Sequence, residues 1–456
     1  MSDFLFKDFK GVSAKEWKQQ IQVDLKGADY NETLIWKNIE GIDVKPFYNE
    51  EDYDSGFYKN SNPNENWKAC QKIFIDDESI ANRLTLDAIQ RGAEAIYFTS
   101  EKEFNIISVF NEVPFSDIKI YINLNFLSEG FYNQLISFLS EKNATVFYNI
   151  DIIGNLAKDG NWYKNLNDDH SVLENILKDN SEKNILSIDA TLYQNAGANM
   201  VQQLAYSLAH ANEYLNHFSN KNLQPTLTFK VAVGTNYFFE IAKIRALRNL
   251  YTLLAKEYGI SEECHIIAFP SKRNKTIYDY NVNLLRTTTE YMSAILGGAN
   301  SICSLSYDAI YHKSNEFGER IGRNQLLILK SESYFNSENN PTEGSYYIEY
   351  LTQQLSEKAL NLFKEIESSG GFLKHLKEGK IQRKIKETAE KEQQLFNEGK
   401  IVLLGTNKHP NEKDLMKNDL ELFPFMKMNP RKTLIEPILE NRLSEEIEKE
   451  RLQNEE

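Results

Sequence analysis

Short apolar segments rich in branched and aromatic residues alternate with helical segments along most of the chain after about residue 72. Each apolar segment has the length of a buried strand, and residues 196–218 between two of them show helical spacing of apolar positions. The eight predicted strands read KIFIDD, AEAIYFTS, IKIYINL, TVFYNIDI, NILSIDA, LTFKVAV, CHIIAF and NSICSLSY. This alternation predicts parallel strands joined by helical crossovers.

Eight strand–helix units favour closure into a (β/α)8 barrel, an α/β fold of the TIM-barrel type. An open, doubly wound parallel sheet is the alternative. The sequence has neither the glycine-rich dinucleotide fingerprint nor the P-loop that would favour the open sheet. We therefore predict a barrel with an N-terminal helical arm and a C-terminal helical extension.

The segment before the barrel predicts a helix followed by an extended arm. Residues 13–26 form the predicted helix, since Ser13 and Glu16 have capping-box spacing and Trp17 begins an apolar face. Residues 27–56 are rich in turn-forming and aromatic residues and lack helical periodicity. Such a segment is expected to lie over another surface.

The segment after Tyr307 is predicted to be mostly helical through about residue 398. Gly399 fits a helix C-cap, and the IVLLG segment that follows fits a short strand. The charged residues of 431–456 predict an exposed helix or frayed tail with a solvated face. The predicted organisation is a helix and arm over residues 1–70, a barrel with its helical extension over 71–425, and a charged helical tail over 426–456.

Two of the predicted strands carry polar residues on one face. Ser187 and Asp189 alternate with apolar residues in one strand, and Thr228 and Lys230 do so in the next. An ordinary barrel strand is apolar on both faces, because helices cover the outside and branched side chains fill the inside. Either these strands line a wet lumen able to take a ligand, or they are edge strands, and the lumen is favoured.

Composition narrows the function classes. The net charge of −14 argues against nucleic-acid binding, although a local pocket can still be basic. No stretch approaches about 18 consecutive apolar residues and no secretory signal opens the chain, so a cytoplasmic protein without membrane contact is expected. The cysteines are isolated in the sequence, so they are predicted to be buried thiols. The histidines lack the spacing of metal ligands, so no metal site is predicted.

Six longer segments of the chain are distinctive. They read SAKEWKQQIQVDLKGADYNETLIWKNIEGIDVKPFY, NAGANMVQQLAYSLAHANEYL, VGTNYFFEIAKIRALRNLY, RTTTEYMSAILGGANSI, ERIGRNQLLILKSES and GSYYIEYLT. Together, and in this order, they resemble the methylmalonyl-CoA mutase family over roughly residues 10–410. The resemblance implies a substrate barrel whose axis is threaded by the CoA arm, and a C-terminal cobalamin domain. It also implies interconversion of methylmalonyl-CoA and succinyl-CoA by a radical path that uses adenosylcobalamin.

The residues that the resemblance assigns to catalysis are replaced. Catalytic members carry Tyr and His after the fifth strand, and these positions are Thr191 and Leu192 here. Leucine has no proton to donate to the migrating thioester carbonyl. Tyr193 is expected to face the opposite side of the strand and not to compensate. No catalytic residue is therefore expected in this chain.

Other family features are also missing. The family places an Arg for the substrate carboxylate after the fourth strand, but no Arg lies between Arg91 and Arg245. Almost nothing of the family's loop after the seventh strand is kept in residues 267–274. The cobalamin-binding domain is expected to be absent, because about 50 residues follow the IVLLG segment. The string nearest to the family's D-x-H-x-x-G signature, residues 168–173, is interpreted as coincidence, so no cofactor-binding residue is expected.

The chain still matches the family at residues that lie at the ends of predicted elements and can pair across barrel helices; we call them the packing framework. Asp189 and Lys230 replace a small and a large apolar residue, and we expect them to pair inside the unused lumen, since a buried unpaired charge costs several kcal/mol. The matched framework positions are Gln194, Asn236, Glu240, Lys243, Arg245, Arg286, Arg320 and Arg323.

A kept scaffold without the chemistry resembles the small, non-catalytic subunit of the heterodimeric members. That reading implies a large catalytic subunit as partner, which binds the adenosylcobalamin of the holoenzyme. One alternative is a catalytic acyl-CoA mutase barrel that uses a cobalamin domain supplied by a separate chain. Another is a scaffold subunit of a related acyl-CoA mutase.

Overall fold

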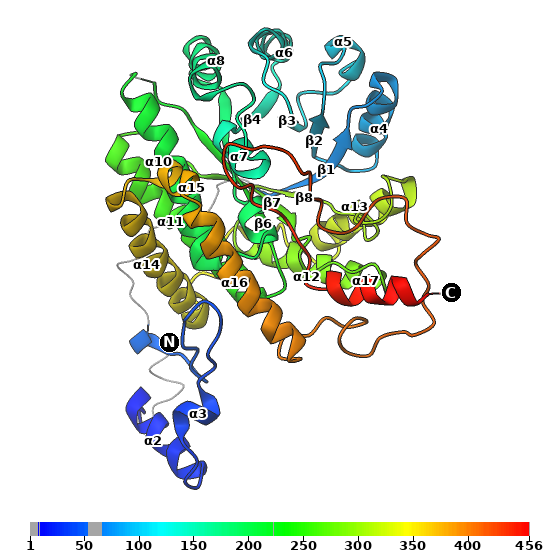
Figure 1. Cartoon of the computed structure of the whole chain (residues 1–456). Coiled ribbons are helices and arrows are strands. Elements are labelled where there is room, and N and C mark those ends of the chain that lie inside the picture. Colours follow the sequence, from blue (N-terminus) through cyan, green and yellow to red (C-terminus); the bar gives the residue numbers. More distant parts are fainter. Residues whose placement is uncertain (1–7, 9, 53–65, 222, 456) are drawn as a thin grey trace.

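The computed structural model describes residues 8, 10–52, 66–221 and 223–455. Eight parallel strands form a closed barrel in which each strand pairs with its neighbours in sequence and β8 pairs with β1 (Figure 1). The strands are β1 (Lys68–Phe74), β2 (Ala95–Ser100), β3 (Lys119–Leu124), β4 (Thr145–Ile150), β5 (Asn184–Asp189), β6 (Leu227–Val233), β7 (His265–Pro270) and β8 (Ser301–Cys303). The predicted (β/α)8 barrel is confirmed, and closure leaves these eight strands without an edge.

Helices surround the barrel (Figure 1). The main apolar core lies between them and the outward faces of the strands. The helices between strands are α4 (Glu78–Gln90), α5 (Ile106–Val109), α6 (Glu129–Glu141), α7 (Ile152–Asp159), α8 (Leu166–Asp179), α9 (Thr191–Asn195), α10 (Met200–Ser219), α11 (Tyr237–Tyr258) and α12 (Val282–Leu296). After β8 follow α13 (Glu316–Ser331), α14 (Tyr346–Ser368), α15 (Phe372–Lys377), α16 (Lys380–Asn397) and α17 (Glu445–Asn454). The predicted helical extension is confirmed.

Several predicted boundaries are shifted by local hydrogen bonding. The first strand begins at Lys68 and ends at Phe74, because the Asp77 side chain accepts from the Ile80 backbone N–H at 2.9 Å and caps α4 instead of extending the strand. Gly399, with φ +72°, ends α16 as predicted. The IVLLG segment is not a strand, since Leu404 makes only an isolated bridge.

Helix α10 begins at Met200, four residues after the start of the predicted helical run. Gly197 has φ +98°, and a Cβ there would lie 2.5 Å from the Ala389 Cβ on α16. The chain therefore turns at Gly197 before Asn199 and Gln202 form a capping box that starts the helix.

The N-terminal arm contains the predicted helix and one that was not predicted. Helix α2 (Ala14–Asp24) starts with the predicted Ser13–Glu16 capping box, and it buries none of its residues within this chain. The following residues form a short helix, α3 (Tyr30–Leu34), because Asp29 caps two of its backbone N–H groups. Residues 53–56 of the predicted arm lie outside the described residues.

Beyond α3 the arm lies over the outer helices, as predicted. The Trp36 ring packs edge-on against Phe239 of α11, and Tyr48 stacks on Tyr347 of α14 with ring centroids 5.1 Å apart. A short 3-10 turn, Glu50–Asp52, follows. Figure 1 shows α2 and α3 projecting away from the barrel body.

Glu40 fastens this arm to the amino end of α10. Its buried carboxyl accepts from the backbone N–H groups of Met200 at 2.7 Å and Val201 at 3.2 Å. The pKa of Glu40 is raised to about 8, chiefly by burial, although the two backbone hydrogen bonds lower it; the charge of Glu240 adds to the rise and that of Lys243 opposes it.

Docking of the arm should therefore weaken as the pH rises. A carboxyl with a raised pKa in the folded state stabilises that state fully below its ordinary value near 4.5, and this contribution is lost as the pH rises through about 8. We expect hydrogen exchange of residues 36–44, corrected for intrinsic rates, to accelerate between pH 6 and 9. Glu40→Gln should remove this dependence, and Glu32→Gln on the exposed face of α3 should not. Protection that stays constant with pH in the unmodified chain would contradict the assignment.

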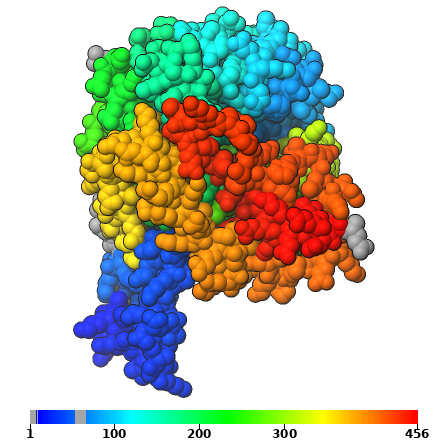
Figure 2. All heavy atoms as spheres, viewed as in Figure 1, coloured from blue at the N-terminus to red at the C-terminus, as the bar shows by residue number. Residues whose placement is uncertain are grey.

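The C-terminal residues 422–444, called here the C-terminal strap, cross the carboxyl end of the barrel and lead into α17. Figure 2 shows this segment lying over the centre of the molecule. The solvated face predicted for residues 431–456 is wrong at two of the charges: the Arg442 guanidinium and the Glu448 carboxylate of α17 pair at 2.6 Å and are both buried. Glu448 also accepts from the Ile277 backbone N–H, so a loop far away in sequence supplies the partner.

Candidate functional site

The carboxyl ends of parallel barrel strands open on one face, where binding sites of such barrels are built. We call this face the mouth. Loops after β4, β5, β7 and β8 and the C-terminal strap enclose a cavity of about 390 Å³ there. Among its lining residues are Lys158, Leu192, Asn195, Lys272, Leu305, Ile310, Phe423, Phe425, Glu440 and Arg442.

The two residues that replace the family's Tyr and His lie at this mouth. Leu192 is buried and lines the cavity, and the Thr191 hydroxyl donates to the Asp189 carboxylate. Tyr193 is not in a strand, contrary to the prediction, because the one-turn helix α9 starts directly after β5. Its hydroxyl lies 3.0 Å from the Nδ1 of buried His210 on α10. Tyr193 is therefore held in the outer core rather than at the cavity.

Inside the barrel, Asp189 and Lys230 form the predicted pair. The Lys230 Nζ lies 2.7 Å from the Asp189 carboxylate and donates to the Asn123 side chain at 2.7 Å across the lumen. Burial alone would raise the pKa of Asp189, but the Lys230 ammonium outweighs burial and holds this pKa below its usual value. These polar residues thus face inward, and the edge-strand alternative is wrong.

Aromatic rings fill the barrel axis below this pair. The Tyr121 ring stacks on Phe147 with centroids 4.9 Å apart, and Phe147 stacks on His265 at 3.9 Å. The Tyr121 hydroxyl lies 2.8 Å from the His265 Nε2, and it donates to Ser301 at 2.7 Å. Burial holds the pKa of His265 well below its usual value, so this imidazole is neutral. The lumen expected to be wet is occupied here by side chains from β3, β4, β7 and β8.

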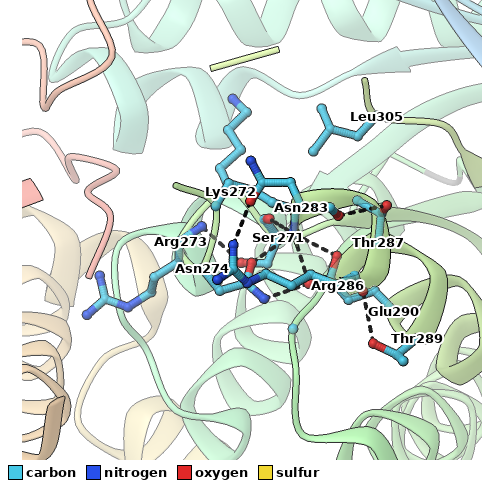
Figure 3. Close-up of polar contacts among 12 residues, drawn as sticks. Ser271, Lys272, Arg273, Asn274, Asn283, Arg286, Thr287, Thr289, Glu290 and Leu305 are labelled. Carbon is cyan, nitrogen blue, oxygen red and sulfur yellow. Dashed lines mark hydrogen bonds and ion pairs between the residues drawn. The ribbon is translucent and has the colours of Figure 1, made fainter. Parts of the chain in front are cut away.

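The loop after β7 divides its side chains between the mouth and the core. Figure 3 shows Lys272 and Arg273 leaving this loop in different directions. Lys272 reaches Glu440 of the strap at 3.3 Å, whereas the Arg273 Nε donates to Glu392 of α16 at 2.6 Å. Lys275 turns inward and pairs with buried Glu290 of α12 at 2.8 Å. The loop thus ties the strap and α16 to the barrel.

The sequence model of the methylmalonyl-CoA mutase family matches residues 95–450. The chain belongs to this family. The methylmalonyl-CoA mutase small subunit of Porphyromonas gingivalis is 31% identical over 89% of this chain and 71% of that protein. The small subunit of Propionibacterium freudenreichii subsp. shermanii is 26% identical over 80% of this chain and 64% of its own length. The large subunit of the Porphyromonas gingivalis mutase is 32% identical over 50% of this chain and 33% of its own length.

Of three framework positions that this mutase resemblance singled out, Gln194 and Arg286 link separate elements of the barrel, and Asn236 starts α11. Gln194 accepts from the Ser271 hydroxyl at 2.9 Å and thereby joins α9 to the loop after β7. The Arg286 guanidinium donates to the Thr276 hydroxyl at 2.9 Å and to the Leu404 carbonyl at 2.7 Å. Asn236 precedes α11 and its carbonyl accepts from the Glu240 N–H, without a side-chain cap.

The mutase family is cobalamin-dependent, and the histidine in the string nearest to the family's signature is not placed as a cobalt ligand. This histidine, His170, lies in the outer helix α8, with its Nδ1 2.8 Å from the Leu166 carbonyl. Within the described ranges, no three His, Cys, Asp or Glu residues are placed to hold a metal ion.

No helix in the described ranges combines the length and the apolar character of a membrane span.

Sequence reasoning missed two mouth residues, Lys72 on β1 and Lys158 on α7. Every second side chain of β1 points into the barrel, and this set includes Cys70, Lys72 and Phe74. The alternation of side chains along a strand therefore already indicated in the sequence that Lys72 faces inward. No comparable signal existed for Lys158, because its direction depends on how α7 packs after β4.

Proposed function

We propose that this chain is the small subunit of an adenosylcobalamin-dependent methylmalonyl-CoA mutase, and that it stabilises a large catalytic subunit without catalysing the reaction itself. The observation that carries this proposal is the aromatic stack of Tyr121, Phe147 and His265. The family resemblance assigns that part of the barrel to the CoA arm. Because protein interiors are close-packed, rings in mutual contact leave an acyl-CoA chain no path along the axis.

The two groups that the family resemblance assigns to the rearrangement are also not in place at the mouth. A migrating thioester carbonyl needs a hydrogen-bond donor aimed at its oxygen, and Leu192 offers only methyl groups at the cavity wall. Recognition of the substrate carboxylate favours a guanidinium fork. The Arg442 guanidinium at this cavity is already paired with Glu448. Adenosylcobalamin, which supplies the radical, is accordingly assigned to the partner subunit.

Association with the large subunit is assigned to the N-terminal arm. An 11-residue helix is only marginally stable in water by itself. Helix α2 nevertheless presents Trp17 and Val23 to solvent, 50% and 70% exposed, and buries nothing in this chain. A partner surface that covers these side chains would supply the missing packing. This reading implies a cytoplasmic heterodimer of two homologous barrels.

The division into arm, barrel and tail is kept as part of this proposal. Since β1 begins at Lys68, we place the first boundary at residue 67 rather than 70. The tail begins near residue 426, within the strap that covers the mouth.

The isolated chain, supplied with adenosylcobalamin and methylmalonyl-CoA, should form no succinyl-CoA above the blank. Coexpressed with the large subunit, it should copurify as a one-to-one complex that turns over. The double variant Thr191→Tyr, Leu192→His should remain inactive alone, because the aromatic stack still closes the axis. Product formation is measured by chromatography of the CoA esters.

The paired control is the large subunit assayed with and without this chain. Turnover by the isolated chain, given a separately expressed cobalamin domain, would establish the alternative of a catalytic barrel with a borrowed cofactor domain. If the two chains neither associate nor stabilise one another, the subunit assignment is wrong.

A further inference from the structure

Three lysines reach the mouth from separate positions around the barrel ring. Lys72 lies on the inner face of β1, two residues beyond buried Cys70, and its side chain is exposed. Lys158 lies in the last turn of α7, after β4, and Lys272 follows β7. Lys158 and Lys272 both line the mouth cavity. Positive charge from three sides of the ring thus gathers at one opening of an acidic protein.

Two of these three ammonium groups lack a partner. Lys272 pairs with Glu440 at 3.3 Å. Among the residues that the structure describes, neither Lys72 nor Lys158 has a hydrogen bond or an ion pair. Other cations near this end of the barrel are paired, such as Lys230 with Asp189 and Arg273 with Glu392. The two free ammonium groups are therefore available to a ligand.

Lys72 lies close enough to Lys158 and Lys272 to be affected by their charges. The Lys72 ammonium keeps contact with solvent but is crowded by the surrounding protein, and this partial loss of hydration lowers its pKa. The positive charges of Lys272 and Lys158 lower this pKa further, while Glu319 opposes the shift. Like charges held at one opening are destabilising in the absence of an anion. An anionic ligand would relieve this repulsion.

The rest of the cavity defines the class of anion. Leu192 and Leu305 form an apolar wall, and a volume of about 390 Å³ admits a small metabolite rather than a polymer. The cations are lysines, which contact an anion as point charges, and three of them around one opening match a multiply charged group such as a phosphate better than a single carboxylate. The Arg442 guanidinium is held by Glu448 and is not available.

We propose that the mouth cavity binds a small phosphate-bearing anion, with Lys72, Lys158 and Lys272 as its cationic ligands and Glu440 as a competing carboxylate. Glu440 lies between Lys272 and the Asn195 amide, which donates to it at 3.1 Å. It occupies one ammonium while the site is empty, and the ligand takes its place. The proposal stands independently of the subunit role, because it concerns only this chain and an anion.

Titration calorimetry of the full chain with inorganic pyrophosphate tests the site. Binding is expected in the unmodified chain and should weaken with added salt, because charge pairs at an open site are screened. Lys72→Gln and Lys158→Gln should each weaken binding at least fivefold, and the double variant at least 20-fold. Glu440→Gln should strengthen binding several-fold, because it frees Lys272 and keeps an oxygen acceptor for Asn195.

Lys178→Gln is the matched control, since this exposed lysine ends α8 at the opposite end of the barrel. It should leave the affinity unchanged. Circular dichroism and thermal unfolding check that the variants stay folded, since the replaced lysine side chains are exposed and Glu440 is half-buried. No binding at millimolar pyrophosphate, or binding that survives the double lysine variant, overturns the proposal. Citrate that binds as tightly as pyrophosphate, with the same dependence on lysine, overturns the phosphate class.

Discussion

Replacement of Glu290 by Ala should lower the free energy of unfolding by about 3–5 kcal/mol, the range expected when one partner of a buried ion pair is removed. The Glu290 carboxylate is fully buried and pairs with the buried Lys275 ammonium at 2.8 Å. Asn274 also donates to it at 2.6 Å (Figure 3). Burial raises the pKa of Glu290 and lowers that of Lys275, so each charge depends on the other. Without Glu290, Lys275 would be a buried charge without a counter-ion.

Urea unfolding followed by circular dichroism measures this loss. Glu387→Ala is the matched control, because Glu387 pairs with Lys384 in an exposed i,i+3 pair on α16 and should cost at most about 1 kcal/mol. The double variant Lys275→Met, Glu290→Met should recover much of the stability, since it removes both charges. An Ala variant as stable as the unmodified chain would show that the pair does not hold the loop after β7 in place.

Replacement of Trp17 by Ala should weaken binding to the large subunit by at least tenfold. Tryptophans that become buried at an interface commonly contribute about 2 kcal/mol or more, and tenfold corresponds to about 1.4 kcal/mol. Half of the Trp17 side chain is exposed, and its ring meets only the edge of Phe47 at 5.8 Å. Biolayer interferometry or sedimentation velocity with the purified large subunit measures the change.

Two further variants separate an interface from a folding effect. Val23→Asp places a charge on the same helix at a side chain that is mostly exposed, and it should weaken binding to a similar degree. Gln20→Ala removes only a surface hydrogen bond to Asp24 and should leave binding unchanged. If Trp17→Ala and Val23→Asp both bind as tightly as the unmodified chain, the interface lies elsewhere.

Local pattern predicted those features whose causes are local. The Ser13–Glu16 capping box starts α2, and Gly399 ends α16, because both depend on residues within one turn of the helix. The IVLLG segment was wrongly predicted as a strand, since a strand needs a neighbour and Leu404 finds only an isolated bridge. The alternation of side chains between the two faces of a strand also placed Asp189 and Lys230 on the same face of adjacent strands, where they pair.

The charged C-terminal tail shows where local pattern fails. Arg442, Glu448 and Glu455 are buried because distant residues satisfy them. Glu455, for example, accepts from the Met416 N–H at 3.0 Å, and Arg442 donates to the Lys275 carbonyl at 2.9 Å. A run of charges predicts solvation only when no folded surface supplies partners, and the sequence does not reveal such partners.

The sequence by itself determined the eight alternating units, the family, and the replacement of a proton donor by Leu192, since each is written in residue order and type. Only the tertiary structure decided that Tyr121, Phe147 and His265 meet on the axis, and that Lys72, Lys158 and Lys272 share one mouth. The reason is geometric. Strand alternation fixes which side chains point inward, but barrel closure fixes which of them, from strands far apart in sequence, come into contact.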